Sequence, residues 1–413
     1  MHIGGKRVGS HLAILVLLVV SLGVGSRPSM ADYVTDWSRI SLSAIDDSGV
    51  PPEEAYRINA IAQTAVFESM NAADPNYSSD IEAADASRRP SLDEKIAGAG
   101  ALLAVFRDLV PEQEPKLRAN LESGTNLPWQ RDSVELGEQI ASEILKLPSA
   151  AAIPDAETYR PFTRAGQYVP TVLPEYLTLP SRKPWILARA NQLRPPQPPS
   201  LGSKAWVSAY QEVKVWGAKK SAKRSQEDSD IAVFWSARVP GKYFGVLYSV
   251  ADLPERTPIE NARFIAIASQ AMDDSLMAVA EAKYHYNFWR PITAIRNGDK
   301  DGNRLTAREG GWLPFIKTPL HPEYPCSHCS HAGIVAQLID VEMDGMSLPE
   351  LKTVSPALPG VERSWQTTRS FCDEVNRARI LGGVHYRFST LSGEELGRAI
   401  GRLASWKYMP IKK

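Results

Sequence analysis

Residues 258–283, PIENARFIAIASQAMDDSLMAVAEAK, decide the fold class of this 413-residue chain. Pro258 suits the first turn of a helix, and apolar residues then recur at spacings of three and four, which is typical of a helix with one buried face. The apolar residues of that face are Ile265, Ala268, Met272, Leu276 and Val279. Lys283 continues the same face, so we expect its ammonium group to point inward, where its charge needs a partner.

Helical spacing recurs along most of the chain, and alternating strand patterns are scarce. The other stretches with this spacing are 51–73, 93–108, 131–147, 203–219, 224–236, 328–342 and 392–406. The pattern predicts an all-α protein. Residues 154–199 differ, because ten of the 31 prolines lie there, and we expect an extended connecting arm. The expected organisation is an N-terminal helical region over 32–150, a Pro-rich arm over 151–202 and a helical domain over 203–408.

The first 31 residues have the order of a secretory signal peptide. Lys6 and Arg7 precede the apolar run 12–24, and Ser29 and Ala31 frame a small-residue cleavage site before Asp32. The alternative is an N-terminal membrane anchor, but the apolar run is short for a span of about 20 residues. We therefore expect a secreted or periplasmic protein that has no membrane segment after cleavage at Ala31.

Charge and cysteine content exclude several classes of function. Removal of 1–31 leaves 44 basic and 47 acidic residues. The mature chain thus lacks the excess of positive charge that is typical of proteins that bind nucleic acid or a membrane surface. Cys326, Cys329 and Cys372 are too few for a disulfide framework, and their redox state does not follow from the sequence. The oligomeric state is equally undetermined.

Residues 283–291, KYHYNFWRP, place two cations among aromatic residues. Lys283 and Arg290 are seven apart, so on one helix they would lie about two turns apart on nearly the same face. Pro291 disfavours helical geometry at Arg290 and is expected to end the element there. The alternative is a solvated basic edge, which the intervening aromatic residues disfavour.

Residues 321–333, HPEYPCSHCSHAG, concentrate histidine and cysteine. Four possible zinc ligands within 326–331 are too crowded for a tetrahedral site, and a redox Cys-x-x-Cys would need a thioredoxin-like setting that the sequence lacks. If Pro325 starts a helix, the amides near Ser327 and His328 become free donors at its positive end, which is a ready anion site. His328 would then donate or accept protons at that site.

A third cluster, ARILGGVHYRFS at 378–389, contains Arg379 and His385. Six residues apart, they would not share a helix face, but Gly382–Gly383 gives the backbone freedom to bring them together. The alternative for His385 is an ordinary core histidine. Taken jointly, the three clusters supply cations, amide donors and histidines, and this combination suits a tetrahedral oxyanion.

The three clusters also match a known signature in order and internal spacing. In these motifs the chain resembles the vanadium-dependent haloperoxidases and type 2 phosphatidic acid phosphatases. The matching positions are Lys283 and, after six residues, Arg290-Pro291; then Pro325-Cys326-Ser327-His328; and then Ala378-Arg379 and, after five residues, His385. Similarity around the motifs, such as FWRPITAIR and GGVHYRF, is to the soluble haloperoxidase-like branch. The resemblance implies paired four-helix bundles around one oxyanion pocket, with 203–408 as the catalytic domain.

The resemblance also implies roles for individual residues. Lys283, Arg290, Arg379 and the Ser327 amide would hold the oxygens of vanadate, His385 would be the axial ligand to vanadium, and His328 the acid/base group. Hydrogen peroxide, polarised by Lys283, would oxidise a halide there, and the product would attack a small organic substrate. Among the phosphatases, the histidine at the position of His385 instead attacks phosphorus. A binding protein without turnover is the third alternative.

Three positions depart from the signature. Cys326 replaces serine, Ser327 replaces glycine, and Ser389 stands where the pattern has aspartate four residues after the last histidine. Loss of that carboxylate removes a partner that would orient His385 and raise its basicity, which argues against strong phosphatase activity. His321 stands where bromide-preferring relatives carry histidine, so the resemblance implies oxidation of bromide and iodide over chloride. The alternative for His321 is a surface residue beside a helix.

Overall fold

The computed structural model of the protein describes Met1 and residues 32–81, 92–125, 129–153, 159–161 and 163–411. The expected signal peptide and its cleavage site thus lie outside the described residues, apart from Met1. From Ala31 onward the chain forms one compact unit. None of the described helices is both long enough and apolar enough to span a bilayer.

The prediction of an all-α fold is confirmed, with one small exception. The α-helices within the described residues are α1 (Tyr33–Asp47), α2 (Pro52–Ala73), α3 (Glu94–Leu109), α4 (Glu114–Thr125), α5 (Arg131–Leu145), α6 (Lys204–Trp216), α7 (Gln226–Phe234), α8 (Gly241–Ala251), α9 (Pro258–Tyr286), α10 (Pro291–Arg296), α11 (Ser327–Glu342), α12 (Thr368–Leu381) and α13 (Arg387–Ser405). The exception is an antiparallel hairpin of β1 (Leu351–Val354) and β2 (Glu362–Trp365), whose strands are too short to leave a clear pattern in the sequence.

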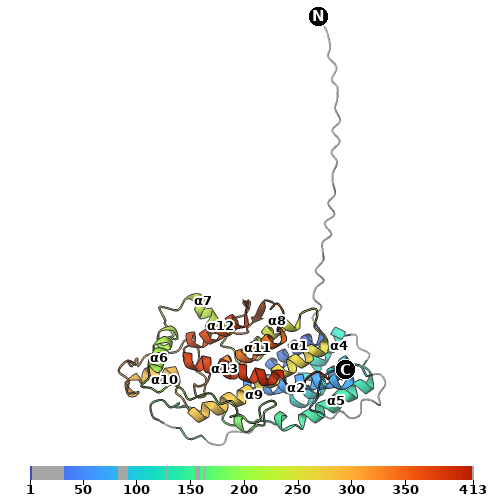
Figure 1. The fold of residues 1–413 in the computed structure, drawn as a ribbon, viewed down its shortest axis with the longest axis horizontal. Helices are drawn as coiled ribbons and strands as arrows, with labels where there is room; N and C mark the ends of the chain where they lie inside the picture. The colour runs from blue at the N-terminus through green and yellow to red at the C-terminus, as the bar shows by residue number, and fades with distance from the viewer. Residues whose placement is uncertain (2–31, 82–91, 126–128, 154–158, 162, 412–413) are drawn as a thin grey trace. The chain divides into compact units, whose positions relative to one another are not determined.

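Two groups of helices share α9 (Figure 1). The first group packs α2 against α3, α5 and α9. In the second, α11 packs against α8, α9, α12 and α13. Because α9 runs through both groups, it is buried on nearly all sides between Asn261 and Lys283 rather than along one face. The apolar face read from the sequence is therefore only part of the buried surface of this helix.

Local signals in the sequence explain both ends of α9. Thr257 and Glu260 form a capping box, and Pro258 occupies the first turn. The helix ends at Tyr286, and Asn287 follows in the left-handed conformation with φ of 47°. We expected Pro291 to end this helix, and that prediction was wrong. Pro291 instead begins α10, and proline suits a first turn because its missing N–H needs no partner there.

The Pro-rich stretch between α5 and α6 is anchored on α9 by polar contacts. Arg182 binds both carboxylate oxygens of Asp273, at 3.0 and 2.9 Å, and both side chains are buried. Asp274 accepts backbone hydrogen bonds from Trp185, Ile186 and Leu187. These contacts hold the arm across the helix that carries Lys283. The functional division of the chain at 150 and 202 stays a prediction.

Candidate functional site

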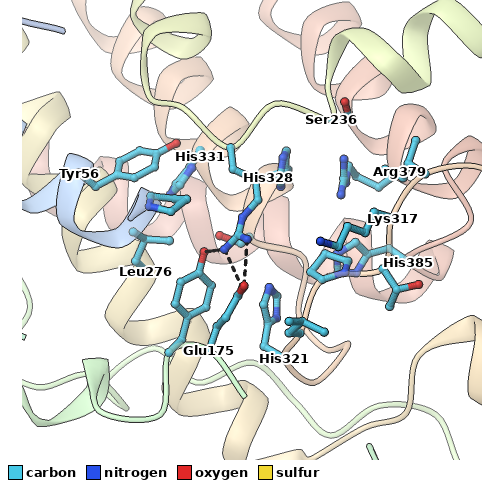
Figure 2. Close-up of a pocket in the computed structure, with 18 of the residues that line it drawn as sticks. Tyr56, Glu175, Ser236, Leu276, Lys317, His321, His328, His331, Arg379 and His385 are labelled. Atoms are coloured by element: carbon cyan, nitrogen blue, oxygen red, sulfur yellow. Dashed lines mark hydrogen bonds and ion pairs between the residues drawn. The ribbon is translucent and has the colours of Figure 1, made fainter. Parts of the chain in front are cut away.

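One cavity of about 290 Å³ is lined by residues from two of the three sequence clusters, 321–333 and 378–389 (Figure 2). His321, Ser327, His328, Arg379 and His385 line it. The rest of its wall comes mainly from the start of α2, the Pro-rich arm, the segment between α7 and α8, the start of α8, the middle of α9 and residues 316–320. Chain segments separated by hundreds of residues thus converge on one partly enclosed space.

The first turn of α11 presents backbone donors to this cavity. The helix begins at Ser327, and Cys326 is its N-cap, so the start lies two residues after the expected Pro325. The Cys326 sulfur accepts from the amide of Cys329, whereas the amides of Ser327 and His328 have no acceptor among the described residues. Unpaired amides at the positive end of a helix favour an anion.

A disulfide between Cys326 and Cys329 closes this turn of α11. The Cys326 amide also donates to the carbonyl of Ser389, at 3.1 Å. Cys372 is a free, buried thiol. The two cysteines that flank Ser327 and His328 therefore bond each other rather than a metal. In the part of the chain that the structure describes, no cluster of three or more His, Cys, Asp or Glu is placed to hold a metal ion.

Arg379 lies in the last turn of α12 with unused hydrogen-bond donors. Its Nη1 donates to the carbonyl of Trp235 at 3.1 Å, but its Nε has no partner and the residue is only 2% exposed. No carboxylate within the described residues pairs with it. Burial lowers the pKa of Arg379 to about 10, which leaves the guanidinium charged at neutral pH. A buried charge with a bare donor is costly unless an anion compensates it.

The glycine pair after α12 turns the chain toward His385, as expected. Gly383 has a φ of 75°, and a Cβ at this position would come within 2.3 Å of the carbonyl oxygen of Gly217. A side chain is therefore excluded there both by conformation and by space. The turn brings His385 to the same cavity as Arg379.

His385 is held by a carboxylate from a different segment. Glu323 Oε1 lies 2.7 Å from His385 Nδ1 and also accepts from the amide of Tyr386 at 3.2 Å. On the other side of the ring, Arg290 Nη1 lies 3.3 Å from Nε2. Because a guanidinium can only donate, Nε2 carries the lone pair and Nδ1 carries the proton, which it donates to Glu323. His385 Nε2 is therefore an unprotonated, nucleophilic ring nitrogen, and Arg290 contacts its lone pair.

This contact corrects our interpretation of Ser389. The Ser389 hydroxyl lies 3.3 Å from His385 Nδ1, so it cannot replace a carboxylate by itself. The orienting partner that the sequence seemed to lack comes instead from Glu323, which is 0% exposed. Burial raises the pKa of Glu323 to about 7, while Lys283 and Arg290 oppose that rise. The stretch HPEYP contained this glutamate, but spacing alone did not connect it with His385.

Lys283 points inward as predicted, but it lies behind the cavity wall. Its ammonium group donates to three backbone carbonyls, those of Pro322, Glu323 and Pro325, at 2.6–2.9 Å. An ammonium has three protons, so its donors are all used. Burial, reinforced by Arg290, lowers the pKa of Lys283 well below its ordinary value. Lys283 thus shapes the loop before α11 and adds positive charge at a distance.

Arg290 also donates most of its hydrogen bonds to residues that form the cavity wall. Its Nε binds the carbonyl of His321 at 2.9 Å, and its Nη1 binds the carbonyl of Val384 at 2.8 Å. Its Nη2 contacts His321 Nδ1 at 3.0 Å. Because α9 ends before it, Arg290 reaches this position from the N-cap of α10 rather than from the helix of Lys283. Its remaining Nη1 proton faces His385 Nε2.

His321 is part of the cavity rather than a surface residue. It is 5% exposed, and its ring packs 4.9 Å from that of Tyr176, centroid to centroid. Burial, together with the charges of Lys283 and Arg290, lowers the pKa of His321 well below its usual range. The imidazole is therefore neutral at neutral pH. Its effect on halide choice stays a prediction.

The structure adds two cations that sequence analysis missed. Arg238 binds both carboxylate oxygens of Glu175 and the hydroxyl of Tyr176, so its charge is compensated. Lys242, near the start of α8, is 2% exposed and has no carboxylate partner; within the described residues it donates only to the carbonyl of Ala237. Burial, and then Arg379, lower its pKa well below the ordinary value. The one sequence signal that could have indicated a buried Lys242 was the set of apolar residues around it in VPGKYFGV.

The donor set of the cavity fits a tetraoxo anion such as vanadate or phosphate. Arg379 brings uncompensated positive charge, Lys242 brings an amine that a bound anion would keep protonated, and two amides of α11 add neutral donors. His385 Nε2 supplies a single nitrogen ligand in the same space. Burial of two cations without counter-ions favours a bound anion, because it would recover the lost solvation of both.

Comparisons with known proteins agree with this architecture. A family model described as the VCPO second helical-bundle domain matches residues 263–411, which include every predicted site residue. No curated protein matches the chain.

Three crystal structures are similar over most of the chain. The first bacterial vanadium-dependent iodoperoxidase has a TM-score of 0.73 and 22% identity, and the alignment covers 92% of this chain and 96% of that one. The holo-type bacterial vanadium-dependent chloroperoxidase has a TM-score of 0.70 and 17% identity, with 86% and 92% covered. The apo-type has a TM-score of 0.67 and 18% identity, with 86% and 93% covered. At these identities the likeness shows the fold.

Proposed function

Because the chain has the vanadium-haloperoxidase fold and its residues 263–411 match the second helical bundle of that family, we propose that it is a vanadate-dependent haloperoxidase. In this proposal it oxidises bromide and iodide with hydrogen peroxide. The observation that carries the proposal is that one cavity holds both an unprotonated His385 Nε2 and the uncompensated charge of Arg379. This combination offers an oxyanion both charge and a single nitrogen ligand.

Each residue has a distinct part in holding the anion. His385 would ligate the vanadium atom through Nε2, because Glu323 fixes the proton on Nδ1. Arg379 and Lys242 would bind the oxygens of the anion, together with the Ser327 amide. Arg290 and Lys283 support this set from behind the wall, where their charge raises the local potential. Bound vanadate would supply a Lewis-acidic centre at which peroxide becomes electrophilic toward halide.

His328 is the proton carrier in this proposal. Its Nε2 lies 3.3 Å from the carbonyl of Ala237, at the lip of the cavity. Burial and the charges of Arg379 and Lys242 lower the pKa of His328 well below its ordinary value. An anion bound between these cations offsets their repulsion, so His328 can then accept a proton and return it to a leaving oxygen. The same group thus serves as base and acid.

The preference for bromide and iodide rests on His321. A neutral imidazole at the cavity wall is less apolar than an aromatic hydrocarbon ring, so it gives less help in stripping water from a small halide. Chloride holds its hydration shell more tightly than bromide or iodide. We therefore propose the order iodide, bromide, chloride for the rate of oxidation, and His321→Phe is the variant that tests it.

A phosphatase that acts through a phosphohistidine at His385 is the second candidate. The contact between Glu323 and His385 favours it, because a carboxylate at Nδ1 makes Nε2 a better nucleophile. The same cations would hold a phosphoryl group, so the fold does not separate the two activities. An anion-binding protein without turnover is the remaining alternative.

One pair of assays separates these candidates. The purified protein is given vanadate, peroxide and bromide, and separately a phosphomonoester without vanadate. Bromination that requires vanadate and is suppressed by phosphate supports the haloperoxidase. Phosphate release that vanadate inhibits supports the phosphatase, and inactivity in both assays with tight vanadate binding supports the binding protein. His385→Ala abolishes whichever activity is present; retained activity would remove that histidine from the mechanism.

We also propose that the protein is secreted or periplasmic, on the basis of the signal-like residues 1–31. N-terminal sequencing of the protein from its native host tests this directly. A mature chain that begins at Asp32 supports export with cleavage. An intact Met1 on a membrane-bound protein would instead support an anchor.

A further inference from the structure

The cavity extends beyond the anion-binding residues into an aromatic end. In Figure 2, Arg379, Lys317 and His385 group on one side, Tyr56, His331 and Leu276 on the other, and His328 lies between the two groups. Tyr56 belongs to α2, which carries none of the three sequence motifs, whereas Leu276 belongs to the middle of α9 and His331 to α11. The proposed function leaves this end of the cavity without a role.

His331 presents an unused acceptor at this end. It is 3% exposed, and its Nε2 has no hydrogen-bond partner. The ring bonds the backbone of Met272, and because Nε2 is unpaired, this bond must use Nδ1 as the donor. Burial lowers the pKa of His331 to about 3, so the ring is neutral. Nε2 therefore carries a lone pair in a buried place, which is costly unless a ligand donates to it.

The walls around this acceptor suit an aromatic ring. The His331 ring lies 4.6 Å from the ring of Tyr56 and 5.3 Å from that of Tyr243, the latter in an edge-to-face arrangement. Leu276 adds an apolar surface. Aromatic and aliphatic side chains with one placed polar atom are the usual lining of a small-molecule site. The whole cavity has a volume of about 290 Å³ and this end is only part of it, so a single ring fits better than a large molecule.

The position along α11 places such a ring beside the proposed chemistry. His328 and His331 are three residues apart on one helix, hence neighbours on one face. A ligand bound at His331 would lie about one helical turn from the proton carrier and next to the anion-binding residues. An oxidised halide formed there would meet it before reaching bulk solvent.

We propose that the end of the cavity formed by Tyr56, Tyr243, Leu276 and His331 is a subsite for a neutral phenol, whose O–H donates to His331 Nε2. This inference rests on the proposed function and extends it to the organic substrate. Bromide gives up an electron pair to peroxide, whose O–O bond breaks to leave two hydroxide ions. The electrophilic bromine forms a C–Br bond on the phenol ring, the C–H bond breaks, and the released proton converts one hydroxide into water, so that one hydroxide is released to the solvent.

Calorimetric titration of the protein with phenol and with anisole tests the subsite without vanadate or turnover. Anisole has the same ring but lacks the donor. A net hydrogen bond predicts about fivefold tighter binding of phenol. His331→Phe keeps the aromatic wall and is expected to remove the preference, whereas His331→Gln, which retains an acceptor, is expected to restore part of it. His285→Leu, at an exposed histidine, is the matched control and should change nothing. Circular dichroism verifies that each variant is folded.

Equal binding of phenol and anisole to the wild-type protein, or an unchanged preference in folded His331→Phe, overturns the subsite. The proposed function is tested separately, by measuring bromination by the vanadate-loaded protein. If phenol binds but nothing is brominated, the subsite stands and the haloperoxidase fails. If the protein brominates phenol with the same ortho-to-para ratio as free hypobromous acid, and His331→Phe leaves this ratio unchanged, the product forms in solution and the subsite fails.

Discussion

Glu323 Oε1 lies 2.7 Å from His385 Nδ1, although 62 residues separate the two side chains in the sequence. The contact fixes the tautomer of the histidine and aims its lone pair at the cavity. It also removes the main objection that the sequence raised against a reactive His385. The proposed chemistry depends on this pair, because a histidine protonated on Nε2 could neither ligate vanadium nor attack phosphorus.

Glu323→Ala is expected to weaken vanadate binding about 10- to 100-fold, as is usual when the partner of a ligating histidine is lost. Glu323→Gln retains an acceptor for Nδ1–H and should lose less. The measurement is the dissociation constant for vanadate, compared with the KM for bromide, which should change little. Glu395→Ala, at an exposed glutamate, is the control. A Glu323→Ala protein with wild-type vanadate affinity would show that the pair does not position His385.

The disulfide predicts a defined thiol content. The unfolded, unreduced protein should expose one titratable thiol, that of Cys372, and the reduced protein three. The loop between Cys326 and Cys329 is short, so reduction should cost only about 2 kcal/mol of unfolding free energy. Thermal unfolding with and without reductant, in wild-type protein and in the Cys326→Ser, Cys329→Ser double variant, measures this cost. Three free thiols without any reductant would contradict the assignment.

The buried pair of Arg182 and Asp273 predicts a large loss of stability when one partner is removed. Asp273→Ala leaves a buried, unpaired guanidinium and should lower the unfolding free energy by about 3–5 kcal/mol. Replacing both residues, with Arg182→Met and Asp273→Leu, should cost less than the single change, because no charge is left alone. Denaturant titration gives both values. A single variant as stable as the double one would mean that the pair does not hold the arm on α9.

Glu68 predicts a pH dependence of stability. It is 1% exposed, and burial raises its pKa from 4.5 to about 7. Because the folded protein binds this proton more tightly than the unfolded chain, the contribution is fully present below pH 4.5 and is lost as the pH rises through 7. The loss amounts to about 3 kcal/mol.

The test is the unfolding free energy of Glu68→Gln between pH 4.5 and 7, which should fall less steeply than that of the wild-type protein. Glu112→Gln, at an exposed glutamate, should follow the wild-type curve. Parallel curves for Glu68→Gln and wild-type protein would show that this carboxyl titrates normally.

Local sequence signals predicted the elements well where caps and periodicity agreed. Pro258 and the apolar spacing of α9 located its start, and the glycine pair before His385 predicted the turn that Gly383 makes. The helices α1, α4, α8, α10 and α12 were not predicted from the sequence. Pro291 was misread, since a proline that ends one helix and one that begins the next look alike in sequence.

The site was predictable only as far as its motifs extend. His328, Arg379 and His385 converge as their clusters indicated. Lys242 and Glu323 could not be placed, because their roles depend on contacts between segments far apart in the chain. Spacing within a motif reports which residues share a turn, but not which distant carboxylate meets a histidine or which lysine lacks a counter-ion.

The most direct test of the account is a calorimetric titration of the protein with vanadate. We predict one vanadate bound per chain, competition by phosphate, and a loss of affinity of about 10- to 100-fold in Arg379→Ala, since a buried charged donor would be removed. Lys242→Met should weaken binding in the same direction. Absence of vanadate binding, or an unchanged affinity in a folded Arg379→Ala protein, would contradict the claim that these buried cations form an oxyanion site.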